Sequence, residues 1–143
     1  MGCDIHAHIE IKVDDEWLYY APANIQRDYR VFEKMAGVRG ELRFAISPPK
    51  GIPDNDASKM TLLHAQNAMS YKHSDSWLSY EEYVILIDYL TANYSSNRHY
   101  DWEHSFLGDF LYLFGGSFYN WGKYKDEYPD FIQDIRIIFW FDN

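Results

Sequence analysis

The chain has little of what holds small secreted or membrane proteins together. Its 143 residues include one cysteine, Cys3, so no disulfide can form within the chain. No basic and then apolar leader is recognisable, and we therefore expect a cytoplasmic protein. The longest apolar runs, residues 84–87 and 135–141, fall well short of the ~20 residues that cross a bilayer. These absences exclude a disulfide framework and predict no transmembrane segment.

Positive charge is also scarce. The chain carries 13 Lys and Arg against 22 Asp and Glu, which gives a net charge of -9 at pH 7. An acidic surface repels a phosphate backbone and no basic patch stands out, so we predict no binding to duplex nucleic acid. Glycine-rich loops of the P-loop or dinucleotide-binding type are missing as well. A nucleophilic role for Cys3 is not expected, because in a strand its side chain would point away from Asp4 and His6.

Aromatic residues, in contrast, are abundant, with 13 Tyr, 9 Phe and 5 Trp. Their rings supply core volume and flat surfaces for a ligand or for a second copy of the chain. A chain of this length can bury about two-thirds of the surface of its unfolded form in one core. We therefore expect a single domain over residues 1–143, and the aromatic content is compatible with a homo-oligomer.

Local patterns predict the α+β class. An N-terminal hairpin is expected, with strands over residues 3–13 and 16–20 around a turn at Asp14 and Asp15. Helices are predicted over residues 24–36, 58–69, 80–93 and 102–114, with a short one after Pro129. A loop over 46–57 and a polar connection over 71–77 separate helices, and the final RIIFWFDN predicts a strand buried on both faces. We expect a small antiparallel or mixed sheet, made of the N-terminal hairpin and the C-terminal strand and covered by helices.

The start of the helix over 80–93 has the clearest local signal. Ser79 followed three positions later by Glu82 is a capping box, in which each residue satisfies a backbone N–H of the other. Leu78 and Tyr83 supply the hydrophobic staple that accompanies such a box. The sequence therefore predicts where this helix begins.

The opening residues suggest a metal site. Asp4, His6 and His8 occupy alternate positions, so in a strand all three side chains leave one face. Carboxylate and neutral imidazole suit zinc, manganese or iron, and a divalent metal held there would activate water for hydrolysis. The pattern is similar to the opening motif of amidohydrolase-type and polymerase-and-histidinol-phosphatase-type metallohydrolases. Those enzymes use a barrel of ~200 residues or more, so the alternative is that Asp4 and His6 form a buried hydrogen-bonded pair.

Further metal-ligating residues follow later in the chain: His99, Asp101, Glu103 and His104. They would complete a metal shell, or else form a solvated start of a helix. Paired terminal strands are expected to bring Asp4 and His6 close to the last strand. The nearest side chains there would be Arg136 and Asp142.

The second hypothesis is a pocket for an anion. Arg30 and Arg39 form a basic stretch in an acidic chain, and polar residues precede Trp77 just before a helix N-terminus. Such a terminus offers unpaired N–H groups to phosphate, while a tryptophan ring can stack on a base. The sequence predicts a small anionic, nucleotide-like ligand, bound by these residues: Arg30, Arg39, His73, Ser74, Ser76 and Trp77. The two polar segments named above would close this pocket. Alternatively, the serines cap a turn, Trp77 is core and the arginines pair with surface carboxylates.

A third hypothesis needs no pocket. In it, the acidic and aromatic surface itself binds and inhibits a partner protein. Charge reversals on the surface would abolish such binding, whereas substitutions of Asp4, His6 or Arg39 would act only through folding.

Five short blocks carry a family resemblance: MGCDIH, RDYRVFEKMAGVRG from Arg27, GIPDNDAS from Gly51, HSDSWL from His73 and RIIFWFDN at the end. In this order they resemble a family of small uncharacterised proteins of bacteriophages and prophages. The resemblance covers the chain from first to last residue and implies a phage-type protein in the cytoplasm of an infected bacterium. It also implies that Asp4 and His6, without His8, are the motif proper. By analogy with phage proteins that act against host defence, the ligand would be a nucleotide immune signal that the protein sequesters.

Overall fold

The computed structural model describes residues 2–23, 25–68, 71–94, 121–122 and 130–142. Their helices and strands are β1 (Asp4–Val13), β2 (Glu16–Ala23), α1 (Tyr29–Ala36), the 3-10 turn η1 (Leu42–Phe44), α2 (Lys59–Asn67), β3 (Lys72–Ser79), α3 (Tyr80–Tyr94) and β4 (Asp134–Asp142). The expected α+β class is confirmed. Within the described ranges, no helix has the length and apolar character needed to cross a membrane.

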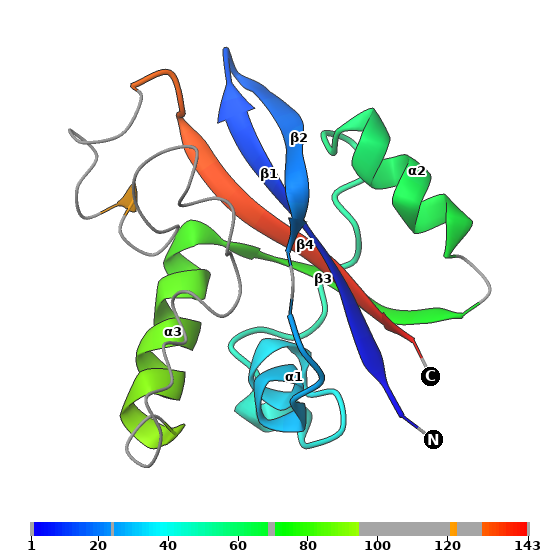
Figure 1. Ribbon diagram of the computed structural model, residues 1–143, viewed down its shortest axis with the longest axis vertical. Coiled ribbons are helices and arrows are strands. Elements are labelled where there is room, and N and C mark those ends of the chain that lie inside the picture. Colours follow the sequence, from blue (N-terminus) through cyan, green and yellow to red (C-terminus); the bar gives the residue numbers. More distant parts are fainter. Residues whose placement is uncertain (1, 24, 69–70, 95–120, 123–129, 143) are drawn as a thin grey trace.

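The strands form one antiparallel sheet in the order β2-β1-β4-β3, shown in Figure 1. The terminal strands pair as predicted, with Asp4 opposite Asp142 and Lys12 opposite Asp134. β4 lies between β1 and β3, and its seven inner residues are all buried. This placement explains why the last strand is apolar at every position except Arg136 between its ends, as expected for a strand with both faces covered.

The N-terminal hairpin turns where the sequence predicts. Asp14 and Asp15 have φ angles of 51° and 63°, the positive values of the type I′ turn that matches the twist of paired strands. The second strand runs beyond the expected residue 20 to Ala23. Its register with β1 shifts between Ile9, which lies opposite Ala21, and Glu10, which lies opposite Tyr19. Pro22 is tolerated because β2 is the outermost strand of the described sheet.

The helices mostly follow their local signals. α1 begins later than the predicted residue 24, because the Asp28 side chain caps it by accepting a hydrogen bond from the Arg30 N–H at 3.0 Å. It ends at Gly37, whose φ of 76° suits glycine. The predicted capping box is present at α3, with Ser79 Oγ accepting from the Glu82 N–H at 3.2 Å and Glu82 Oε1 from the Ser79 N–H at 3.1 Å.

Two predicted segments differ from the structure, and others lie outside the described residues. The prediction of a polar connection over residues 71–77 is wrong. This segment belongs largely to β3, because the apolar β4 needs a neighbour on its second edge. The short helix predicted after Pro129 is absent from residues 130–142, which form a turn and then β4. The helix predicted over 102–114 and the candidate ligands at 99–104 lie outside the described residues.

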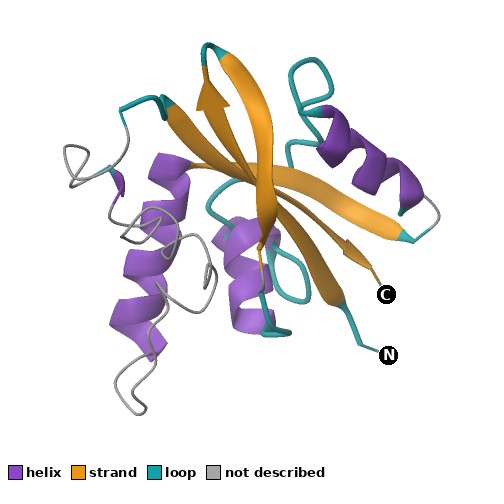
Figure 2. Cartoon of the chain, turned by 45° about the horizontal axis from the view of Figure 1, so that its top comes forward, coloured by secondary structure: helices purple, strands orange, loops and turns teal. Residues whose placement is uncertain are grey.

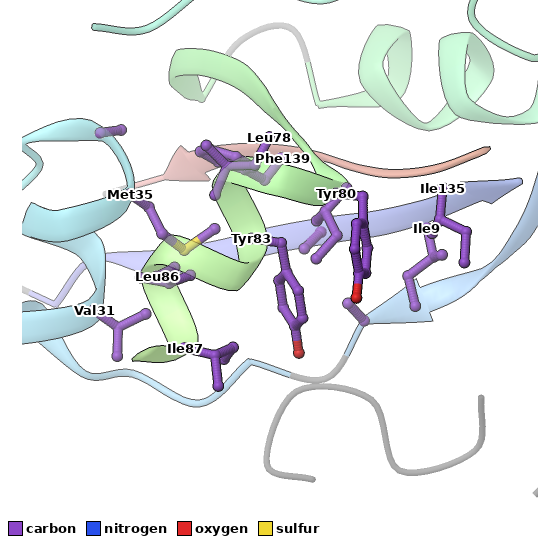
Figure 3. Packing of buried hydrophobic residues seen from close by; sticks show 14 of the residues in the cluster. Ile9, Val31, Met35, Leu78, Tyr80, Tyr83, Leu86, Ile87, Ile135 and Phe139 are labelled. Atoms are coloured by element: carbon purple, nitrogen blue, oxygen red, sulfur yellow. The ribbon is translucent and has the colours of Figure 1, made fainter. Parts of the chain in front are cut away.

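The sheet is covered on both faces (Figures 1 and 2). α1 and α3 pack on one face, where Ile137 and Phe139 of β4 join the main core, and Figure 3 shows side chains of these two helices meeting the strands. The alternating residues Ile138 and Trp140 point to the opposite face, where Ala65 of α2 packs on them. Polar and charged side chains gather on this α2 face, so it holds the candidate sites.

Candidate functional site

The opening motif lies on the α2 face but its members have different partners. Asp4 accepts two hydrogen bonds from Arg27 at 2.8 and 2.9 Å, and this guanidinium lowers the pKa of the Asp4 carboxyl. His6 Nε2 lies 2.5 Å from an Asp142 carboxylate oxygen. His8 Nδ1 contacts the Tyr19 hydroxyl at 2.9 Å. The side chains of Asp4, His6 and His8 thus lie on one face of β1, as expected.

No metal cluster accompanies this arrangement in the part of the chain that the structure describes: no three His, Cys, Asp or Glu side chains there are placed to hold an ion. A divalent metal at Asp4, His6 and His8 stays a prediction. The alternative of a buried Asp4–His6 pair differs from the structure, because both side chains are about half exposed and Asp4 binds Arg27 while His6 binds Asp142.

The expected grouping with the last strand is half right. Asp142 lies opposite Asp4 and contacts His6, as the sequence predicts. Arg136 does not join them, because the antiparallel register pairs it with Glu10, four residues along the strand from His6. The predicted meeting of Asp4 and His6 with Arg136 is therefore wrong.

The structure distributes the predicted ligand contacts over both faces of the sheet. Arg30 binds the Asp28 carboxylate, and Arg39 lies over the Tyr29 ring at 5.6 Å, so both belong to the α1 side. His73 stacks on Phe141, a residue of the main core.

The remaining predicted contacts are on β3. Ser74 has a φ of 55° beside the bulge of this strand, and its hydroxyl contacts the ring of His73 at 3.0 Å. Ser76 is fully buried and accepts a hydrogen bond from the Lys50 N–H. Trp77 packs on the α2 face, with Lys50 Nζ 3.8 Å from its ring centre. These six residues therefore do not line one pocket, and their ligand roles stay predictions.

Two clefts flank α2. The first, which we call the β2 cleft, has a volume of about 720 Å³. It is lined by the hairpin and by the segment that leads into α2: Lys12, Asp15, Glu16, Trp17, Leu18, Tyr19, Asn55, Asp56, Ala57, Ser58, Lys59 and Met60. The second has a volume of about 540 Å³ and lies where the 46–57 loop meets the start of β3. Its lysines, Lys50 and Lys72, are already paired with Glu82 and Asp75.

A buried ion pair lies beside the β2 cleft. Arg136 donates to Glu10 Oε1 from Nε at 2.9 Å and from Nη2 at 2.7 Å, with side chains only 4% and 0% exposed. The guanidinium also lies 4.0 Å from the ring centre of Trp17. Two charges removed from water in this way must satisfy each other, and through its contact with Trp17 the pair touches the cleft wall.

Sequence reasoning missed this pair, although a signal was present. An arginine at position 136, inside a strand buried on both faces, requires a buried acidic partner. Glu10 is one of the few acidic residues inside a predicted strand, so it could have been proposed as that partner.

A cluster of rings lies next to the cleft. His8, 7% exposed, stacks on His64 of α2 at a centroid distance of 4.6 Å, and its partner Tyr19 reaches the cleft wall. Burial, and then the charges of His64 and His6, lower the pKa of His8 from 6.5 to about 4. Burial also raises the pKa of Tyr19. At neutral pH these two groups therefore carry no charge.

In comparisons with known proteins, no family model, no curated protein and no solved structure matches this chain.

Proposed function

We propose that the protein binds a small nucleotide-like ligand, with a flat ring and an anionic group, in the β2 cleft. The observation that carries this proposal is the pairing of aromatic and cationic side chains in one hollow. Trp17 and Tyr19 line the cleft together with Lys12 and Lys59. The volume of about 720 Å³ is in the range of small-molecule sites.

The aromatic wall favours a flat ligand. Two cationic groups lie over the Trp17 ring, the Arg136 guanidinium at 4.0 Å and Lys12 Nζ at 5.7 Å from its centre. The Tyr19 hydroxyl contacts His8 at 2.9 Å, so both rings have neighbours that hold them before a ligand arrives. Pre-organised rings bind a base or a similar heterocycle without first losing rotamer freedom. This is the part of the cleft that would hold the ring.

The lysines favour an anionic group. None of the ion pairs between described residues involves Lys12 or Lys59. Each ammonium can therefore pair with a phosphate without breaking an existing salt bridge. The two ammonium groups share the cleft with three carboxylates, those of Asp15, Glu16 and Asp56. An anionic group would therefore bind at the lysines, by charge-assisted contacts.

The proposal is tested by calorimetric titration with the ribonucleoside 5′-monophosphates, their 3′,5′-cyclic forms and the parent nucleosides. We expect at least one phosphate-bearing ligand to bind. The double variant K12Q/K59Q is expected to bind it at least about tenfold more weakly, since it loses two charge-assisted contacts. Absence of binding to every nucleotide, or equal binding by this variant, contradicts the proposal.

A matched control loses the same two charges elsewhere. Lys34 lies over the Tyr89 ring on the α1 side, and Arg43 pairs with Glu41 on η1. The double variant K34Q/R43Q should bind like the wild type, because neither side chain lines the cleft. If it weakens binding as much as K12Q/K59Q does, only the overall charge matters.

The fate of the ligand separates binding from catalysis. We propose that the protein holds its ligand intact, as a protein that sequesters a host nucleotide signal during phage infection would do; this role rests on the family resemblance. Mass spectrometry of the ligand recovered after denaturation gives the answer. An unaltered ligand supports sequestration, and a hydrolysed one points instead to an enzyme.

A further inference from the structure

Arg136 has hydrogen-bond partners both in the buried interior and on the wall of the β2 cleft. Besides its two bonds to Glu10, its Nη2 donates to Asp56 Oδ1 at 3.0 Å. Glu10 is fully buried, whereas the Asp56 side chain is 49% exposed and lines the cleft. The guanidinium thus has one carboxylate partner inside the protein and one at the ligand side.

The two carboxylates are held to very different degrees. Glu10 Oε2 accepts further hydrogen bonds from the Ser58 N–H at 2.8 Å and from Thr61 Oγ1 at 2.7 Å. Removing Glu10 would leave several buried donors without acceptors, which is costly. The Asp56 side chain has only its bond to Arg136 among the described residues, and water can solvate it when it leaves. Asp56 is therefore the exchangeable partner.

A ligand bound in the cleft can reach the position of the Asp56 carboxylate. Trp17 lies 4.0 Å from the Arg136 guanidinium, and Trp17 and Asp56 line the same hollow. Lys59, three residues after Asp56, lines it too. A ring held near Trp17 would therefore carry its anionic group to the position that the Asp56 carboxylate now occupies.

We propose that Asp56 stands in for the ligand's anionic group, and that an oxygen of that group takes its place on Arg136 Nη2. The inference rests on the proposed function and names the residue that the ligand displaces. The exchange replaces one anionic oxygen by another, so the buried Glu10–Arg136 pair keeps an acceptor at Nη2 throughout. A neutral ring without an anionic group cannot make this exchange, so Asp56 sets the preference for the charged ligand.

The test compares the variants D56N and D15N with the wild type in the titration described above, for each nucleotide and its parent nucleoside. Asparagine at position 56 is neutral and holds Arg136 less strongly, so D56N should bind a nucleotide about tenfold more tightly and its nucleoside with unchanged affinity. Asp15 lines the same cleft and pairs with Gln133 rather than Arg136. D15N removes the same charge and should strengthen nucleotide binding less than about threefold.

The outcomes separate the inference from the proposed function. Measurable nucleotide binding by the wild type, with a larger gain in D56N than in D15N, supports displacement. If the wild type binds a nucleotide and the two variants gain equally, or D56N gains nothing, the inference is wrong and the proposed function stands. If the wild type binds no nucleotide, the proposed function and the inference that rests on it are both wrong. Circular dichroism of each variant checks that the fold is unchanged.

Discussion

Arg136 and Glu10 show how single residues constrain this fold. They come from β4 and β1, are 126 residues apart in the chain, and meet in a register position where both side chains are buried. Ser58 and Thr61 complete the hydrogen bonding of Glu10, so the pair also fastens the start of α2 to the sheet. One buried pair therefore links three elements and contacts Trp17 of the cleft wall.

At this scale we predict that Glu10→Gln destabilises the protein. The substitution keeps the shape of the side chain but leaves the buried Arg136 charge without its inner counterion, and the expected loss in free energy of unfolding is about 3 kcal/mol. Urea unfolding of the variant and the wild type measures it. The control is Glu41→Gln, which breaks the exposed pair with Arg43 and should leave the unfolding midpoint within error. Equal midpoints for E10Q and wild type would contradict the prediction.

At the scale of elements, local capping determines where helices begin. α3 follows β3 without a loop, so the chain must change from extended to helical backbone between Ser79 and Tyr80. The reciprocal bonds of Ser79 and Glu82 satisfy backbone N–H groups at that point. Leu78 and Tyr83 on either side are fully buried, which fixes the direction in which α3 leaves the sheet.

The prediction for this element is that Ser79→Ala lowers the free energy of unfolding by about 1 kcal/mol, because a helix N-terminal N–H loses its acceptor. Ser79→Thr retains the hydroxyl and should keep most of the stability. Denaturant titration of the two variants compares them directly. A similar loss in both would indicate that packing at position 79, and not the cap, is responsible.

At the scale of the whole molecule, two histidine rings, which can be protonated, lie where α2 packs on the sheet. His8 of β1 lies between Tyr19 of β2, His64 of α2 and Trp140 of β4. Protonating His8 would place a charge at the centre of this contact. The stability of the layered fold should therefore depend on pH.

The sign follows from the pKa of His8, which is 6.5 when unperturbed and about 4 in the folded protein. As pH falls through this window, the unfolded chain takes up a proton that the folded one does not. The free energy of unfolding should therefore fall, by up to about 3 kcal/mol, and the fall should end near the folded pKa. Urea unfolding at a series of pH values measures it.

The variants His8→Gln and His8→Phe isolate this contribution. Neither side chain titrates, and phenylalanine retains a ring that can stack on His64. Both should therefore lose stability less steeply than the wild type over the same pH range. If both keep the wild-type slope, another group is responsible for it.

The sequence by itself determined the features that depend on near neighbours in the chain. The I′ turn at Asp14 and Asp15, the capping box at Ser79 and the apolar last strand each follow from a few adjacent residues, and together they were enough to predict the α+β class. Strand periodicity likewise placed Asp4, His6 and His8 on one face. Such signals are local because backbone dihedral preferences and capping bonds span only a few positions.

Only the tertiary structure decided which distant side chains meet. The β1–β4 register brought Arg136 to Glu10 and not to the opening motif, and the layering of the sheet separated Arg30 from Trp77 on opposite faces. The β2 cleft likewise forms only when the hairpin and the segment before α2 come together. Partners far apart in sequence are chosen by strand order and by the burial of whole faces, which depend on the complete chain and not on any one segment.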